Sequence, residues 1–312
     1  MAALYIDVRI PALKIPLVVL YTVVLAAILA KHKLRARSAL LCLACFCVIL
    51  IWWLSLQPTN RANWQPDVDR PASIEINKDQ VVIHNFRNCD YRTETDYTNC
   101  WSDRTVNLSD LRGVDLFFTT WGGRWIGHPI LSFDFGNGQH IAFSIEARYK
   151  VGQTCSAILG FFRQYELICV VADERDVIRL RTNYRKDEEV YLYRGTLAPE
   201  EVRGMFMAYV QYLNQLKSQP EWYNAATRNC TTTLDRQLSA KLAQPQPWNY
   251  QFLMNGTLDK LLYDRGRLVT NGLSFDQLKE QSHINTAARA AGTSPDFSTL
   301  IRTGRPGFEG QR

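Results

Sequence analysis

The sequence predicts an α+β domain that follows two membrane-spanning helices. Two uncharged apolar segments near the N-terminus, at 15–30 and 38–56, have the length of helices that cross a bilayer. Further along, the stretch 128–146 alternates apolar and polar residues about a glycine-containing turn, which is typical of a β-hairpin. Apolar residues between 199 and 217 recur instead at helical spacing. Strands and helices are therefore both expected after residue 56.

The loop between the two apolar segments predicts their orientation. Its charged residues are all basic, namely Lys31, Lys33, Arg35 and Arg37, and short loops rich in Lys and Arg stay on the cytoplasmic side. Both ends of the chain are then expected outside, so residues 1–56 form the anchor and the rest is exported. The alternative is a signal peptide cleaved near Ala30 and followed by one anchor, which exports the same residues.

Charge is unevenly distributed along the chain, whose formal net charge is +6. The first 56 residues hold six of the 36 basic residues and one of the 30 acidic residues. The exported part is left with 30 basic and 29 acidic residues. A net charge this close to zero does not attract a polyanion such as nucleic acid. We therefore expect the membrane as a partner and no nucleic acid.

Composition divides the exported part into three regions. A proline-containing linker is expected over residues 57–72, followed by the globular domain over residues 73–295. The last residues, 296–312, are rich in Ser, Thr, Gly and Pro and predict a flexible tail.

Short apolar runs outside the hairpin predict further elements. Strands are expected at Ala72–Ile76, Gln80–Phe86, Val114–Thr120, Leu167–Ala172 and Asp176–Thr182. Helices are expected at 154–165, from Pro199 to Lys217, from Asn229 onward and at 252–263.

The hairpin pattern also predicts its register. If Phe135 pairs with Gln139 across a turn centred on Asn137, one face is mostly apolar and the other mostly polar. A one-residue slip would mix the two sets, so burial selects this register. It places Glu146 directly opposite His128, where the two side chains can meet.

The cysteines of the exported part suggest an oxidising compartment. Cys89 and Cys100 flank a polar loop, and a disulfide between them would close it. A second pairing, between Cys155 and Cys169, stays open because no geometry can be derived for it. Cys230 has no obvious disulfide partner, and an unpaired thiol in an exported domain needs an explanation.

Cys230 lies where a reactive thiol is expected. Asn229 is a favoured N-cap, so Cys230 would be the first residue of a helix. The positive end of the helix dipole lowers the pKa of such a thiol and favours the nucleophilic thiolate. Backbone amides at the same helix end can receive an oxyanion. We therefore expect Cys230 as nucleophile, with Asn229 and Thr231 supporting the oxyanion.

A thiol nucleophile needs a base, and five histidines are available. His128 has a carboxylate, Glu146, opposite it in the hairpin, so Cys230, His128 and Glu146 form the arrangement of a cysteine acyl-transfer site. The rival pair, His140 with Asp134, is expected to be a surface contact beside the turn. The alternative is that Cys230 is an inert buried thiol and His128 is a structural histidine. The Cys and His spacing does not match zinc ligands, so we expect no metal and no cofactor.

Seven segments of the exported part also resemble a known family. They are WGGRWIGHPILSFDF, HIAFSIEAR, GFFRQYELI, VVADERDVIRLRTNYR, WYNAATRNCTTTL, LLYDRG and QSHINTAARAA. In these segments the sequence resembles the Lnb N-terminal periplasmic domain family, formerly a domain of unknown function, and through it the permuted papain-like proteins that include NlpC-like enzymes. The resemblance implies a permuted papain-like (NlpC-like) α+β domain, an antiparallel sheet packed on helices, with Cys230 as nucleophile and His128 as base.

The resemblance also implies an activity. Lnb is a lipoprotein N-acyltransferase, so a similar protein is expected to be a thiol-dependent acyltransferase or acyl hydrolase that acts on a lipid or lipoprotein ester through a thioester. The expected location is the bacterial inner membrane, with the domain in the periplasm. Two alternatives stay open: a cell-wall peptidase or amidase that uses the same Cys and His, and a non-catalytic envelope scaffold.

Overall fold

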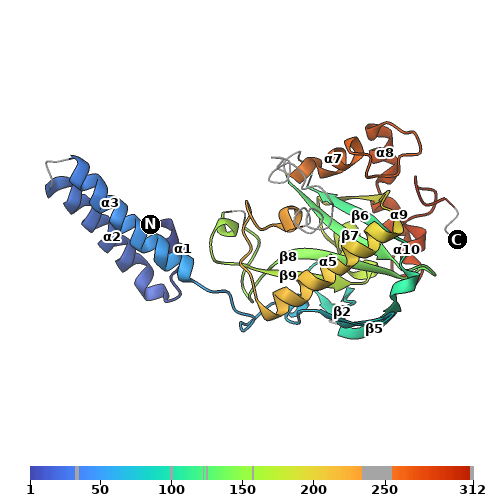
Figure 1. Ribbon diagram of the computed structural model, residues 1–312, viewed down its shortest axis with the longest axis horizontal. Coiled ribbons are helices and arrows are strands. Elements are labelled where there is room, and N and C mark those ends of the chain that lie inside the picture. The colour runs from blue at the N-terminus through green and yellow to red at the C-terminus, as the bar shows by residue number, and fades with distance from the viewer. Residues whose placement is uncertain are drawn as a thin grey trace.

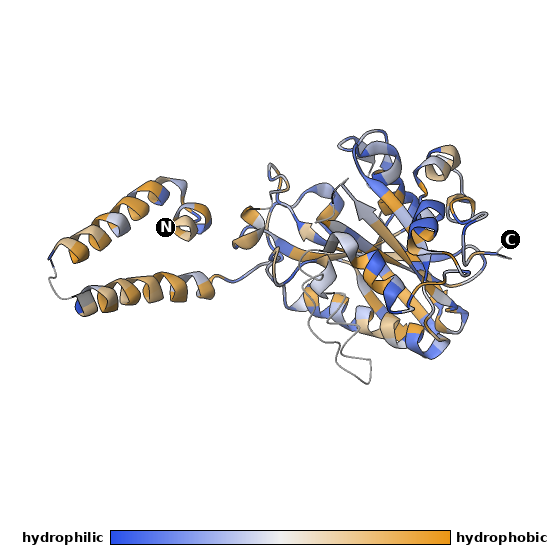
Figure 2. Cartoon of the chain, turned by 90° about the horizontal axis from the view of Figure 1, so that it is seen from above, coloured by the Kyte–Doolittle hydropathy of each residue, from blue (hydrophilic) through white to orange (hydrophobic). Residues whose placement is uncertain are grey.

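Two long apolar helices extend from one side of an α+β domain (Figure 1). The computed structural model describes residues 1–31, 35–98, 101–121, 123, 126–156, 158–233 and 255–309. Helices α2 (Pro11–Lys31) and α3 (Arg35–Ser55) are each long and apolar enough to cross a membrane. Figure 2 shows that both helices are mostly hydrophobic along their length. Their apolar side chains are mostly exposed, as expected of surfaces that face lipid. A short helix, α1 (Ala2–Asp7), precedes them and packs against α2.

One mixed sheet organises the domain, in the order β1-β2-β9-β8-β7-β6-β10, with β5 also paired to β2. Its strands are β1 (Ser73–Asn77), β2 (Gln80–Arg87), β5 (Trp101–Asn107), β6 (Gly113–Thr120), β7 (Gly127–Asp134), β8 (His140–Arg148), β9 (Glu166–Ala172) and β10 (Glu189–Arg194). The described pairings are antiparallel apart from β2 with β9, which is parallel. The expected antiparallel sheet is therefore a mixed one. A separate ribbon pairs β3 (Asp90–Tyr91) with β4 (Tyr97–Thr98).

Helices pack on both faces of this sheet. The long helix α5 (Pro199–Ser218) crosses one face (Figure 1). The other elements are α4 (Glu174–Arg179), the π-helix η4 (Leu180–Tyr184), α7 (Leu258–Asp264), α8 (Phe275–Ser282), α9 (Asn285–Ala291), α10 (Phe297–Leu300) and the 3₁₀ turns η1 (Pro66–Val68), η2 (Leu108–Asp110), η3 (Leu159–Phe161) and η6 (Asn255–Thr257).

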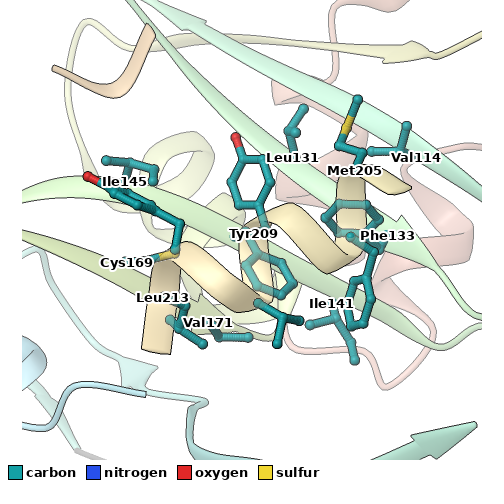
Figure 3. Packing of buried hydrophobic residues seen from close by; sticks show 14 of the residues in the cluster. Val114, Leu131, Phe133, Ile141, Ile145, Cys169, Val171, Met205, Tyr209 and Leu213 are labelled. Atoms are coloured by element: carbon teal, nitrogen blue, oxygen red, sulfur yellow. The ribbon is translucent and has the colours of Figure 1, made fainter. Parts of the chain in front are cut away.

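Alternation along the central strands divides the core into two clusters. The first cluster lies between the sheet and α5, and Figure 3 shows Phe133 of β7 and Tyr209 of α5 within it. The ring of Phe133 is edge-on to the rings of Phe143 and Phe206, at 5.3 and 5.2 Å between centroids. The second cluster lies on the opposite face and joins Ile130 and Ala142 to side chains of α4, α9 and α10. Side chains at neighbouring strand positions therefore enter different clusters.

The predicted hairpin register is confirmed where β7 and β8 pair. Leu131 lies opposite Phe143 and Asp134 opposite His140, and the Phe135 amide donates to the Gln139 carbonyl at 2.9 Å. The helix predicted from Pro199 is also confirmed, and its periodic apolar residues are buried in the first cluster.

The strand predicted at Asp176–Thr182 is wrong, because this segment forms α4 and η4. The Asp173 side chain accepts a hydrogen bond from the Arg175 amide at 3.0 Å and caps the helix start. Val177 and Ile178 favoured a strand locally, but in the helix both are buried in the second cluster. The helix predicted at 154–165 is reduced, in its described part, to the 3₁₀ turn η3.

The segments predicted as linker and tail are packed against the domain. Within 57–72, Trp64 and Val68 are buried, and the Arg148 guanidinium lies 4.2 Å above the Trp64 ring. Within 296–312, Phe297 and Ile301 are fully buried in the second cluster. The prediction of a flexible tail is therefore wrong for residues 297–308, because they complete the core.

Candidate active site

His128 and Glu146 meet at the open end of the hairpin, through a third residue. The His128 Nε2 atom lies 2.9 Å from Ser144 Oγ and 3.7 Å from Glu146 Oε1. Ser144 Oγ in turn donates to Glu146 Oε1 at 2.7 Å. Since the Ser144 proton goes to Glu146, Nε2 of a neutral His128 carries the hydrogen and Nδ1 is its basic nitrogen. The predicted pairing is present, and Ser144 bridges it.

Arg181 adds a positive charge that sequence analysis missed. Its guanidinium donates to Glu146 Oε1 at 3.0 Å and to Glu188 Oε2 at 3.1 Å. Burial is the largest single effect and would raise the pKa of Glu146, but the charges of Arg181, His128 and Arg185 and the hydrogen bond from Ser144 together outweigh it and hold that pKa well below its usual range. Glu146 is therefore a carboxylate at any physiological pH.

His128 is a neutral base in this setting. Burial, followed by the charge of Arg181, lowers the pKa of His128 to about 3, and the charge of Glu146 offsets only part of this shift. A neutral imidazole can accept a proton, and the carboxylate of Glu146 nearby can stabilise the imidazolium that forms.

The predicted helix start at Cys230 is confirmed over the described residues 230–233. Asn229 Oδ1 accepts hydrogen bonds from the amides of Thr231 and Thr232 at 3.0 and 2.9 Å, and its Nδ2 donates to the Ala225 carbonyl at 2.8 Å. Asn229 is therefore the N-cap. The Thr231 amide, expected to support an oxyanion, is engaged by this cap in the resting protein.

The pKa expected for Cys230 is wrong in direction. Burial raises the pKa of the thiol to about 11, and the hydrogen bond with Thr231, at 3.8 Å between Sγ and Oγ1, offsets only part of that rise. Smaller effects come from Glu146, which raises it, and Arg181, which lowers it. The loss of solvation raises the pKa of Cys230 more than the helix end lowers it, so the resting thiol is protonated.

Cys230 and His128 have different apolar packing neighbours. Cys230 packs against the first cluster. His128 shares its strand face with Ile130 of the second cluster. The charges of Glu146 and Arg181 nevertheless act on the Cys230 thiol, so these groups lie within electrostatic range of one another. Direct pairing of the sulfur with the His128 imidazole stays a prediction.

The raised pKa predicts slow alkylation of Cys230 at neutral pH. Iodoacetamide labelling, followed at this residue by peptide mass spectrometry, is expected to reach half its maximal rate near pH 11. A cysteine in an unstructured peptide does so at about pH 8.5. The thiolate is the reactive form, so a higher pKa moves the profile to higher pH. Half-maximal labelling at or below the pH of the peptide would contradict the burial that we describe.

The rival pair His140 and Asp134 is not at the surface. Both are buried, and His140 Nδ1 lies 3.8 Å from Glu174 Oε1. Asp134 accepts a hydrogen bond from Arg194 at 3.0 Å. The prediction of a surface contact is wrong because α4 and α10 cover this end of the hairpin with a buried network of charges.

The remaining cysteine predictions have different outcomes. Cys100 lies outside the described residues, so the pairing of Cys89 with Cys100 stays a prediction. Cys155 is exposed and Cys169 is buried, and neither forms a disulfide. Among the described residues, no group of three or more His, Cys, Asp or Glu side chains is arranged to hold a metal ion.

Comparison with known proteins gives one match. A family model described as the Lnb N-terminal periplasmic domain matches residues 97–256, about half of the chain. The matched range includes His128, Ser144, Glu146, Arg181 and Cys230. No curated protein and no solved structure matches the chain.

Proposed function

The chain belongs to the family of the Lnb N-terminal periplasmic domain, and on that premise we propose that it is a thiol-dependent acyltransferase or acyl hydrolase acting on a lipid or lipoprotein ester. The family and the two apolar helices together indicate a periplasmic domain anchored in a membrane. We propose the bacterial inner membrane, because its outer face borders the periplasm. We also propose the permuted papain-like fold, supported by the order of His128, Glu146 and a helix that begins at Cys230.

One observation carries the proposal: Ser144 bridges the carboxylate of Glu146 to the neutral base His128, in a domain where a helix capped by Asn229 begins at Cys230. A nucleophile, a base and a group that orients the base are the parts that acyl transfer to sulfur requires.

The proposed reaction has two halves. His128 Nδ1 takes the Cys230 proton as the sulfur attacks the ester carbonyl, because neither group is ionised at rest. The ester C–O bond breaks, and the leaving alcohol takes the proton from the imidazolium. An amine or a water molecule then attacks the thioester and passes its proton to His128. The C–S bond breaks, and the imidazolium returns the proton to the Cys230 thiolate.

Within this scheme Glu146 and Arg181 are positioning residues. Glu146 stabilises the imidazolium, and Ser144 accepts the Nε2 hydrogen, which leaves Nδ1 as the basic nitrogen. Arg181 keeps Glu146 ionised despite burial.

The test offers two substrates to the full-length chain. Purified diacyl lipopeptides are expected to lose an acyl chain, with a transient mass increase on Cys230 equal to that chain. Muropeptides, analysed by mass spectrometry in parallel, are expected to stay intact. Cleavage of muropeptides with unchanged lipopeptides would favour the peptidase or amidase. No reaction with either substrate would favour the scaffold.

A further inference from the structure

A cavity of about 510 Å³ separates the outer end of α3 from the loop that leads to Cys230. On the membrane side it is lined by Trp53 and Leu54 of α3 and by the residues just after that helix. On the domain side it is lined by Arg163, Trp222, Tyr223 and Arg228. The cavity therefore borders both the membrane anchor and the approach to the proposed nucleophile.

Hydrogen bonds hold these two walls together. Asp7 Oδ2 accepts from Trp53 Nε1 at 2.7 Å, while Asp7 Oδ1 accepts from the Arg163 amide at 3.1 Å and from Gln164 Nε2 at 2.6 Å. Trp222 Nε1 donates to the Leu56 carbonyl at 2.9 Å. The anchor and the domain are thus joined around the cavity, which is a built feature of the fold.

Two guanidinium groups contribute to the cavity. Arg163 lies 4.4 Å above the Trp53 ring, and its Nε is buried without a hydrogen-bond partner in the part of the chain that the structure describes. Burial lowers the pKa of Arg163, Asp7 raises it, and Arg228 lowers it again, so the two arginines repel each other. Arg228 also pairs with Glu221. An anion between the two guanidinium groups would reduce their repulsion and could accept a hydrogen bond from Arg163 Nε.

A second, apolar groove of about 1080 Å³ adjoins this cavity. Leu56, Gln57 and Pro58 line both. Its remaining walls include Leu17 of α2 and Ile49 of α3, from the helices that are apolar enough to span a membrane. A groove at this place is open to acyl chains.

We propose that the cavity binds the phosphate headgroup of a bilayer phospholipid between Arg163 and Arg228, with an acyl chain of the same lipid in the adjoining groove. Bidentate guanidinium groups match phosphate oxygens, and Trp53 and Trp222 are residues typical of the membrane interface. The occupant is a lipid because the charged cavity and the apolar groove meet. This binding does not depend on the proposed acyl-transfer chemistry.

The experiment uses the full-length chain carrying Cys230→Ala, so that no turnover can remove the lipid. The chain is reconstituted in vesicles of phosphatidylglycerol and phosphatidylcholine, extracted gently, and analysed for retained lipid by native mass spectrometry. Retained phospholipid is expected, and the double variant Arg163→Gln with Arg228→Gln is expected to retain at least about tenfold less, because two charge-assisted phosphate contacts are lost.

Controls keep this outcome specific. Arg267→Gln, which does not line the cavity, is expected to retain lipid as before. Arg163→Lys, with Arg228 unchanged, keeps the charge but not the bidentate contact, and it is expected to retain more lipid than Arg163→Gln alone. A thermal midpoint that matches the parent shows that the double variant is folded.

Several outcomes would overturn the proposal. They are equal retention by the double variant, retention by Arg163→Lys no greater than that by Arg163→Gln, and competition by inorganic phosphate as strong as that by phosphatidylglycerol, which would indicate a site for free anions. Equal retention of diacylglycerol, which has no phosphate, would also overturn it.

Discussion

The Cys230→Ala variant is expected to lose acyl transfer by at least about 10⁴-fold, since removal of a nucleophile leaves only the contributions of binding and charge stabilisation. No thioester can form without the sulfur. The fold should persist, because the hydrogen bonds of Asn229 to the Thr231 and Thr232 amides do not involve the thiol. The measurement is release of an acyl chain from a diacyl lipopeptide, with circular dichroism to monitor the fold.

Two further variants make this result interpretable. Cys155→Ala removes an exposed thiol and is expected to leave the rate unchanged. His128→Ala is expected to reduce the rate nearly as much as Cys230→Ala, because both act in one proton transfer. Full activity in Cys230→Ala would refute the mechanism. Full activity in His128→Ala would leave Cys230 as the proposed nucleophile but would require a base other than His128.

The Arg302→Met variant is expected to lower the free energy of unfolding by about 3–5 kcal/mol, because it leaves buried carboxylates without their cation. Arg302 donates to Asp115 Oδ2 at 2.7 Å and to Glu174 Oε1 at 2.6 Å, and both acidic side chains are fully buried. Asp115 keeps Arg194 as a partner, so Glu174 carries most of the expected effect. Urea denaturation followed by tryptophan fluorescence measures it.

The acid dependence of stability provides a second measurement on the same variant. Burial would raise the pKa of Glu174, but Arg302 outweighs it and lowers that pKa to about 2. A depressed pKa contributes stability above the unfolded-state value of about 4.3 that is lost as the pH falls. The parent should therefore show this loss, and Arg302→Met should not. Arg70→Met, at an exposed site, is the control. A change below about 1 kcal/mol in Arg302→Met would contradict the role of this cluster.

Local patterns were sufficient to predict the hairpin and the helix start. Strand alternation specified the register of β7 and β8, because a slip would exchange the buried and polar faces. Asn229 before Cys230 was sufficient to predict the cap, because this hydrogen bonding spans only three residues. Alternation along β8 also places Ser144 on the same face as Glu146, so the bridge to His128 was open to prediction.

Features that depend on distant contacts were not predictable. Arg181 reaches Glu146 from η4, which directly follows α4. In α4, Val177 and Ile178 favour a strand locally but are buried as helical residues in the second cluster. The pKa of Cys230 depends on burial by elements far along the chain, which a capping motif does not reveal. Edge strand β10 was missed because its pairing with β6 connects residues about 70 positions apart.

The contacts of Arg302 also bear on how this protein is made. Its partners Glu174 and Asp115 lie 128 and 187 residues earlier in the chain, so both are synthesised long before the cation that neutralises them emerges from the ribosome. The nascent chain meanwhile carries incomplete apolar surfaces that are prone to aggregation. We therefore expect the protein to cross the membrane unfolded, to need chaperones in transit, and to lose stability when the chain is truncated before Arg302.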